Sequence, residues 1–119
     1  DMISSGGSMI DTAKQLKKMN AKRVFICCTL GLFTDGLAAF DEAYEHCYFD
    51  RIITTNLCYQ PPELKEKPYY QEADMSKFIA SIINFMNHDA SMSNIYTPTE
   101  KIRHILEKYN NREEDALEG

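Results

Sequence analysis

The sequence predicts an α/β fold of three layers, in which a mostly parallel sheet is flanked by helices. Segments with helical periodicity alternate with short apolar segments in the order helix, strand, helix, strand, helix, which is typical of parallel strands joined by right-handed crossovers. The apolar segment 24–28 (VFICC) shows no polar–apolar alternation, as expected of a strand that is covered on both faces. Ligands in such folds bind beyond the carboxyl ends of the strands. We therefore expect a binding site at the loops that leave the strands.

Length and composition restrict the function classes. The 119 residues form one domain at most, and 44% hydrophobic with 26% charged residues is the balance of an ordinary soluble globular chain. A net charge of −5 without a dense stripe of Lys and Arg argues against a nucleic-acid surface. No apolar run has the length of a membrane span, and no signal peptide is visible. The cysteines form no CxxC pair, so we expect free thiols in a cytoplasmic protein without nucleic-acid or membrane partners.

The first part of the chain predicts a helix followed by a strand. An apolar stripe at helical spacing predicts a helix over 8–19, where Ser8 and Asp11 resemble a capping box. The strand 24–28 comes next, and its two adjacent cysteines are expected to be buried core residues rather than nucleophiles. The segment 29–36 contains two glycines and is interpreted as the loop that leaves this strand.

The middle of the chain repeats the alternation. Helical periodicity returns from Leu37, and a second strand is predicted over 51–54. Three prolines make 57–68 a loop, after which 69–73 has the composition of a short strand. Asp74 is then expected to cap a further helix, whose apolar residues follow at steps of three and four.

The end of the chain predicts one more helix. Residues 97–100 (TPTE) combine a capping residue, a proline in the first turn and a glutamate at the third position, which indicates a strong helix start. Residues 110–119 are polar and acidic and are expected to fray. We therefore divide the chain into a domain over 1–96 and a terminal helix with an acidic tail over 97–119.

The opening stretch 1–8 (DMISSGGS) is the clearest candidate for a binding site. Gly6 and Gly7 would let backbone amides approach an anion, and the helix start that follows leaves free N–H groups. The serine hydroxyls add donors, and Asp1 could bind sugar hydroxyls or a magnesium ion. The alternative is an ordinary Ser/Gly turn that caps a helix. The chain begins inside this motif, without the strand that normally precedes such a loop, so we expect a piece of a longer protein.

Two further loops are expected to meet this stretch at the carboxyl edge of the sheet. They are the segment 29–36 and the corner 54–56, each of which follows a predicted strand. The histidines His46, His88 and His104 have no partner at metal-ligand spacing, so we assign them surface or capping roles.

In this context the stretch 1–8 resembles the ribose-phosphate loop of type I phosphoribosyltransferase folds. Together with 29–33 (TLGLF) and 53–56 (ITTN), it is similar to the carboxyl-terminal part of the ribose-phosphate diphosphokinases, which make phosphoribosyl pyrophosphate. The turn 91–93 (SMS) also resembles the ending of that family. The resemblance extends from the first residue to Tyr96 and leaves the last helix outside.

The resemblance implies a function for the opening loop. Ribose 5-phosphate would be bound by the residues Asp1, Ser4, Ser5, Gly6, Gly7 and Ser8. It further implies the transfer of diphosphate from ATP to ribose 5-phosphate with magnesium, in a homo-oligomer. The ATP site and the catalytic loop of the family would precede Asp1. We therefore assign no catalytic residue and no metal ligand within the chain, and we expect the isolated chain to be inactive.

The chain departs from the family pattern around the loop. The acid that would precede Asp1 is absent, Ser4 stands where the family has Asp, Ser5 and Ser8 stand for Thr, and Leu30 replaces a common His. A less negative loop remains compatible with phosphate, but the role of the lost acid does not carry over. Two alternatives stay open. One is a nucleobase phosphoribosyltransferase, which shares the opening loop, and the other is a non-catalytic relative that regulates an active synthetase.

Overall fold

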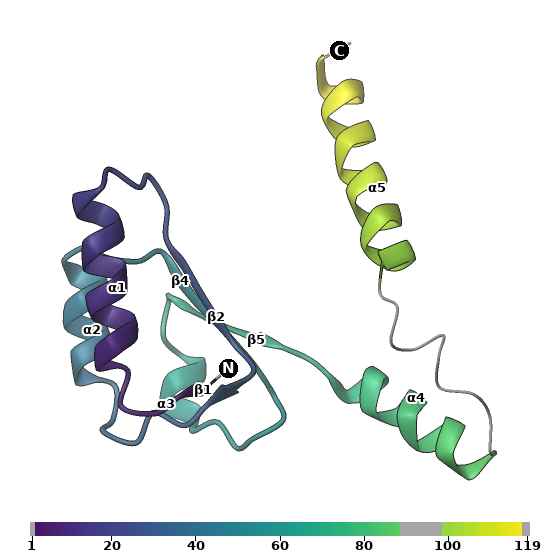
Figure 1. Cartoon of the computed structure of the whole chain (residues 1–119), viewed down its shortest axis with the longest axis horizontal. Coiled ribbons are helices and arrows are strands. Elements are labelled where there is room, and N and C mark those ends of the chain that lie inside the picture. The colour runs from purple at the N-terminus through teal and green to yellow at the C-terminus, as the bar shows by residue number, and fades with distance from the viewer. Residues whose placement is uncertain (1, 89–98, 118–119) are drawn as a thin grey trace. The chain divides into compact units, whose positions relative to one another are not determined.

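The computed structural model describes residues 2–88 and 99–117 (Figure 1). The chain divides into two compact units, Asp1–Lys77 and Phe78–Gly119. The division predicted from the sequence, after residue 96, lies outside the described residues and stays a prediction. The turn 91–93 also lies outside them.

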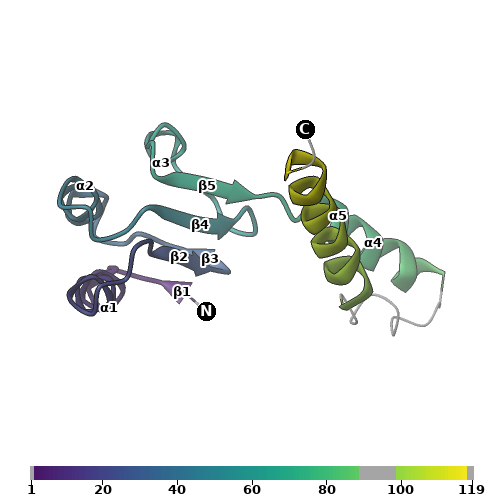
Figure 2. The same cartoon turned by 90° about the horizontal axis from the view of Figure 1, so that it is seen from above.

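All strands of the first unit are parallel. β1 pairs with β3, and β4 pairs with β2 on one side and β5 on the other. Their bounds are β1 (Met2–Ile3), β2 (Phe25–Cys28), β3 (Leu30–Gly31), β4 (Arg51–Thr55) and β5 (Tyr70–Ala73). Because Thr29 alone separates β2 from β3, these two act as one interrupted strand, and successive strands lie side by side across the sheet (Figure 2). This parallel sheet, whose strands alternate with helices along the chain, confirms the predicted α/β class.

The helices of the first unit follow from this strand order. They are α1 (Gly7–Lys18), α2 (Ala38–Glu45) and the short α3 (Pro62–Lys65). Right-handed crossovers that all advance in one direction place their helices on one face of a sheet, and Figure 2 shows α1 and α2 on the same side of the strands. The predicted first helix is confirmed to within a residue or so, whereas α3, β1 and β3 lie in segments for which the sequence predicted no element.

The core lies between the sheet and these helices. Ile26 and Ile52 from the strands and Phe40 from α2 are buried in it, together with Phe49 and Tyr69. The rings of Phe49 and Tyr69 meet edge to face at 5.4 Å between centroids. Tight packing of this kind fixes the helices on the sheet.

The segment 24–28 is not buried on both faces, which corrects the sequence-based expectation. Its side chains alternate, with Ile26 buried while Phe25 and Cys27 are exposed. Because neighbouring side chains of a strand point to opposite faces, only one face of β2 meets the core. Cys27 is therefore accessible to a thiol reagent, contrary to the expected burial, and Cys28 is half-buried.

The helix α4 (Ser76–Asn87) begins in the first unit and is held there by side chains. Asp74 accepts a hydrogen bond from the Ser76 N–H at 2.9 Å, which confirms its predicted capping role. Asn56 adds three bonds. Its Oδ1 accepts from the Met75 N–H at 2.8 Å, and its Nδ2 donates to Asp74 at 2.8 Å and to the Ser76 hydroxyl at 3.3 Å.

The second unit contains most of α4 and the helix α5 (Thr99–Leu117). The described backbone stays helical to Leu117, so the fraying expected from residue 110 onward is wrong over that range. Both helices expose their large apolar side chains, namely Phe78, Ile79, Ile83 and Met86 on α4 and Ile102, Ile105, Leu106 and Tyr109 on α5. None of the helices in the described part of the chain has the length and apolar character needed to span a bilayer.

Candidate anion-binding site

The helix α1 begins without a side-chain cap. Its capping position is Gly6, in the left-handed region with φ 88°, and no side chain bonds the helix start. The first bond of the helical pattern runs from the Ile10 N–H to the Gly6 carbonyl at 3.0 Å. The N–H groups of Gly7, Ser8 and Met9 therefore precede the helical ladder and have no acceptor within it.

The capping box predicted for Ser8 and Asp11 is wrong. Ser8 lies inside the first turn, and its carbonyl accepts a bond from the Thr12 hydroxyl at 2.8 Å. The Asp11 carboxylate instead forms an exposed ion pair with Lys14 at 3.8 Å. The helix start is left open where the sequence predicted a closed one.

The two glycines of the opening loop have different surroundings. A Cβ added to Gly6 would lie 2.0 Å from the Cζ of Phe40, whereas a Cβ added to Gly7 would meet nothing within 4 Å. The positive φ and the ring both require glycine at position 6. Gly7 has neither requirement, because a Cβ at this position would meet open space.

The loop after β3 meets the opening loop, as the sequence predicted. The Leu32 N–H donates to the Ile3 carbonyl at 2.8 Å, and the Thr34 N–H donates to the Ser4 carbonyl at 3.1 Å. The hydroxyls of Ser4 and Thr34 lie 3.4 Å apart. These contacts place a second hydroxyl-bearing loop against the start of α1.

The corner at the end of β4 lies on the other side of β3. The Thr55 hydroxyl donates to the Thr29 carbonyl at 2.5 Å, and the buried Thr54 hydroxyl shares a 2.8 Å bond with that of Tyr70. Asn56 is occupied by Asp74 and Met75. The three predicted loops thus share one edge of the sheet, but Thr54 and Asn56 make structural bonds there.

Four of the predicted site residues present polar groups or backbone to solvent. Ser4, Ser5, Gly7 and Ser8 are exposed, Gly6 is buried, and Asp1 lies outside the described residues. The sequence-based set missed Thr34, although a hydroxyl in a loop that leaves a strand was a signal for it.

The opening loop 1–8 contains no basic side chain of its own. The first Lys or Arg of the chain is Lys14, about two turns beyond the helix start. Asp35 accepts a bond from the Thr34 hydroxyl at 3.2 Å and adds negative charge nearby. An anion would therefore be held by backbone N–H groups and hydroxyls, each bond to a charged group contributing about 1.5–3 kcal/mol.

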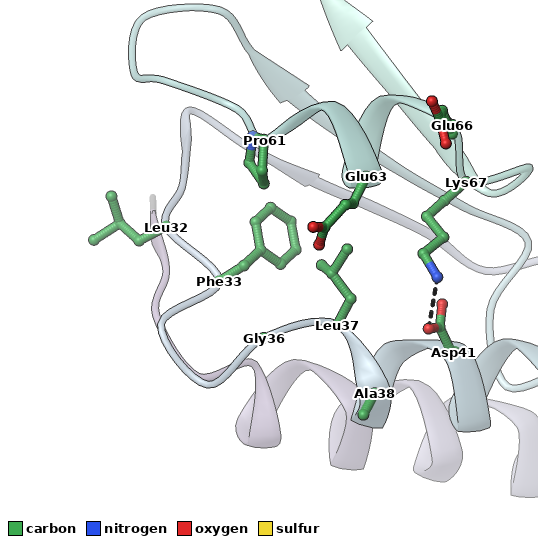
Figure 3. Close-up of a pocket in the computed structure, with 10 residues that line it drawn as sticks. All are labelled: Leu32, Phe33, Gly36, Leu37, Ala38, Asp41, Pro61, Glu63, Glu66 and Lys67. Atoms are coloured by element: carbon green, nitrogen blue, oxygen red, sulfur yellow. Dashed lines mark hydrogen bonds and ion pairs between the residues drawn. The ribbon is translucent and has the colours of Figure 1, made fainter.

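A hollow of about 620 Å³ lies beside the loop that follows β3. Figure 3 shows the ring of Phe33 between Pro61 and Leu37, with the carboxylate of Glu63 directed into the space. At its inner end Lys67 binds Asp41 at 2.7 Å. The Asp41 carboxylate also accepts a hydrogen bond from the Tyr69 hydroxyl at 2.8 Å. Burial, and after it this hydrogen bond, raises the pKa of Tyr69 above its ordinary value.

The described residues do not fit a metal centre. Within 2–88 and 99–117, no group of three or more His, Cys, Asp or Glu side chains could hold a metal ion. The Ser4 hydroxyl, which stands where the family has Asp, is neutral, whereas magnesium prefers carboxylate and phosphate oxygens. We therefore derive no step that passes through magnesium.

Comparison with known proteins supports one family. No protein-family model matches the chain. The ribose-phosphate pyrophosphokinase of Mycoplasma pneumoniae is 30% identical over 106 residues, which cover 88% of this chain and 30% of that protein. The enzyme of the same name from Pasteurella multocida is 31% identical over 97 residues, which cover 82% of this chain and 30% of that protein.

A solved structure supports the fold. The phosphoribosylpyrophosphate synthetase from Mycobacterium smegmatis superimposes with a TM-score of 0.65 at 24% identity, over 76% of this chain and 29% of that one. The chain thus spans about 30% of the length of the relatives it matches. Ribose-phosphate pyrophosphokinase and diphosphokinase are two names for one enzyme, so these matches confirm the resemblance: the chain is related, as a partial domain, to the ribose-phosphate pyrophosphokinases.

Proposed function

We propose that the chain supplies the ribose-phosphate-binding part of an enzyme that transfers diphosphate from ATP to ribose 5-phosphate. One observation carries this proposal. The start of α1 lies at the carboxyl edge of a parallel sheet with no side-chain cap, and a Cβ at Gly7 would meet open space. Free N–H groups at such a position favour an anion through both hydrogen bonds and the helix dipole.

Backbone N–H groups and hydroxyls around the helix start would bind the sugar phosphate together. The N–H groups of Gly7, Ser8 and Met9 would donate to the phosphate oxygens. The exposed hydroxyls of Ser5 and Ser8 would add bonds from the side of the loop. By resemblance alone, Asp1 would lie near the ribose hydroxyls.

ATP binding and catalysis are proposed for the protein that contains the rest of this family's sequence. The chain matches about 30% of the length of its relatives. Magnesium, a homo-oligomeric assembly and a cytoplasmic location enter the proposal through the resemblance only. We expect the 119-residue chain alone to form no phosphoribosyl pyrophosphate from ATP and ribose 5-phosphate. Turnover above a blank in a coupled assay would place catalytic residues inside this chain.

A regulatory role is the second candidate, and Ser4 favours it. This neutral residue stands where the family has an acid, and its hydroxyl faces that of Thr34 rather than a charged group. A regulatory relative would bind the sugar phosphate and an active synthetase without turnover of its own. The relatives described above are named ribose-phosphate pyrophosphokinases, which gives a nucleobase phosphoribosyltransferase less support.

Substitutions in the loop test the proposal by ligand titration. Gly7→Val places a branched side chain in the open space that the phosphate would occupy, so the affinity for ribose 5-phosphate should fall at least about tenfold. Gly7 has no positive φ and no close neighbour, so the variant should stay folded. Ser5→Ala removes one hydroxyl and should cost about 0.5–1.5 kcal/mol of binding.

Amide shifts of the ¹⁵N-labelled chain would measure both affinities, with circular dichroism as the check of folding. Gly7→Ala is the matched control, because its single methyl group fills less of the same space. Normal binding by a folded Gly7→Val chain would show that the loop is only a helix start, and the proposed function would then lose its basis.

A further inference from the structure

The ring of Phe40 occupies the space directly beneath the backbone of Gly6. Three ring atoms of Phe40 lie 2.0, 2.6 and 2.9 Å from where a Cβ of Gly6 would be. Phe40 is completely buried, whereas the next residue of the loop, Gly7, is exposed. The ring therefore packs against the loop from the side opposite to the proposed phosphate position.

A second pair of the same kind lies beside the first. A Cβ on Gly31 would lie 2.5 Å from the Cε2 of Phe33. Phe33 itself has φ 48°, a conformation that is strained for a bulky residue and persists only where the surroundings hold it. The rings of Phe33 and Phe40 meet edge to face at 5.2 Å. These two rings therefore join the opening loop to the strand β3.

We propose that Phe40, supported by Phe33, is a positioning residue for the anion-binding helix start. The inference rests on the proposed function and adds residues that touch no ligand. A glycine that lacks a close neighbour samples many backbone conformations. The ring of Phe40 restricts Gly6 to the one that directs the following N–H groups toward a single point, and binding by a preorganised site avoids the cost of ordering it.

A matched pair of core truncations separates positioning from ordinary packing. Phe40→Leu shortens the ring under Gly6, and Phe49→Leu shortens a ring that is equally buried but packs against Tyr44 and Tyr69. Both variants should lower the free energy of unfolding, because each leaves a cavity. Only Phe40→Leu should weaken ribose 5-phosphate binding, by about tenfold, since misplaced donors lose much of their effect. Phe49→Leu should bind within about twofold of wild type.

A compensating substitution gives a readout that a purely structural role would not move. Gly6→Ala should lose most ribose 5-phosphate binding, because its methyl group collides with the ring of Phe40. Combining Gly6→Ala with Phe40→Leu makes room for that methyl group, whereas the strain of an alanine at the positive φ of position 6 remains, so the recovery is partial. The double variant should therefore bind more tightly than Gly6→Ala alone, although two independent defects would make it bind more weakly.

Amide shift titrations of the 119-residue chain with ribose 5-phosphate measure every variant, and urea unfolding measures its stability. If the wild-type chain does not bind, the proposed function fails and this inference fails with it. If the wild type binds, and Phe40→Leu binds equally well or the double variant binds more weakly than Gly6→Ala alone, the positioning role alone is overturned. Should Phe40→Leu not fold, Phe40→Met, whose flexible side chain adapts to irregular space in a core, is judged by the same criteria.

Discussion

Two helices of this chain begin at the same edge of the sheet, and they begin differently. The start of α4 is closed, because Asp74 and Asn56 accept the N–H groups of Ser76 and Met75. The start of α1 is open, because Gly6 offers no side chain and no other residue in the described part of the chain caps it. Both follow a parallel strand closely in sequence, so the difference lies in the residues at each start.

The difference shows which helix start is available to a ligand. A polar group left without a partner costs free energy unless water or a ligand satisfies it. At α4 side chains of the protein accept the N–H groups of Met75 and Ser76, which leaves fewer donors for an anion. At α1 the donors stay free and small residues surround them, so an anion can approach. We therefore expect α1 to respond to phosphate and α4 to be insensitive to it.

Addition of a phosphate ligand should give the largest contrast between the two starts. On titration of ribose 5-phosphate into the ¹⁵N-labelled chain, the amide signals of Gly7, Ser8 and Met9 should move, because their N–H groups would gain charged acceptors. The signals of Met75 and Ser76 should stay in place. Equal shifts of the amide signals at both helix starts would indicate non-specific binding. The two starts would then not differ in their availability to an anion.

Ribose without the phosphate is the control for this titration, since it retains the sugar hydroxyls and lacks the charge. It should leave the signals at α1 unmoved. A response to ribose alone would show that the loop recognises the sugar rather than the phosphate.

Removing a side chain should destabilise the protein more at the start of α4 than at the start of α1. Asn56→Ala deletes three hydrogen bonds at the start of α4 and should lower the free energy of unfolding by about 1–2 kcal/mol. Ser8→Ala at α1 removes a hydroxyl that caps nothing, so the free energy of unfolding should change by less than about 0.5 kcal/mol. Urea unfolding of both variants measures the two values, and similar losses would contradict the assignment of an open start.

Sequence reasoning identified these elements well where the signal is local. The stripe of apolar residues placed α1, and Asp74 was recognised as the cap of α4, because both patterns depend on neighbouring positions. The elements β1, β3 and α3 are two to four residues long, which is too short for a periodic pattern.

The parts that sequence reasoning missed depend on distant contacts. Gly6 replaces Ser8 as the first capping position because its backbone packs on Phe40, a contact between residues far apart in sequence. The hydroxyl of Thr34 reaches the site only because its loop bonds Ser4. Continuous apolar character cannot tell one covered face from two, which is why Cys27 was expected to be buried.

The smallest expected effect is a pH dependence that only the closed start possesses. Hydrogen bonds from the Ser76 hydroxyl and backbone N–H, and then from Asn56, hold the pKa of Asp74 below its ordinary value. A carboxylate with a depressed pKa stabilises the fold above its unfolded pKa, and that stability is lost as the pH falls through the folded pKa. The cap of α4 should therefore be constant near neutral pH and weaken below about pH 4.

Asp74→Asn tests this, because an amide oxygen still accepts the Ser76 N–H and does not titrate. Other carboxylates also titrate in acid, among them Asp41 and Asp50, whose pKa values are likewise lowered. The relevant quantity is therefore the difference between wild type and Asp74→Asn in free energy of unfolding, followed from pH 7 to pH 3. This difference should shift in favour of the variant as the pH falls. A difference that stays constant with pH would mean that the charge of Asp74 adds nothing to the cap, and that the closed start depends on hydrogen-bond geometry alone.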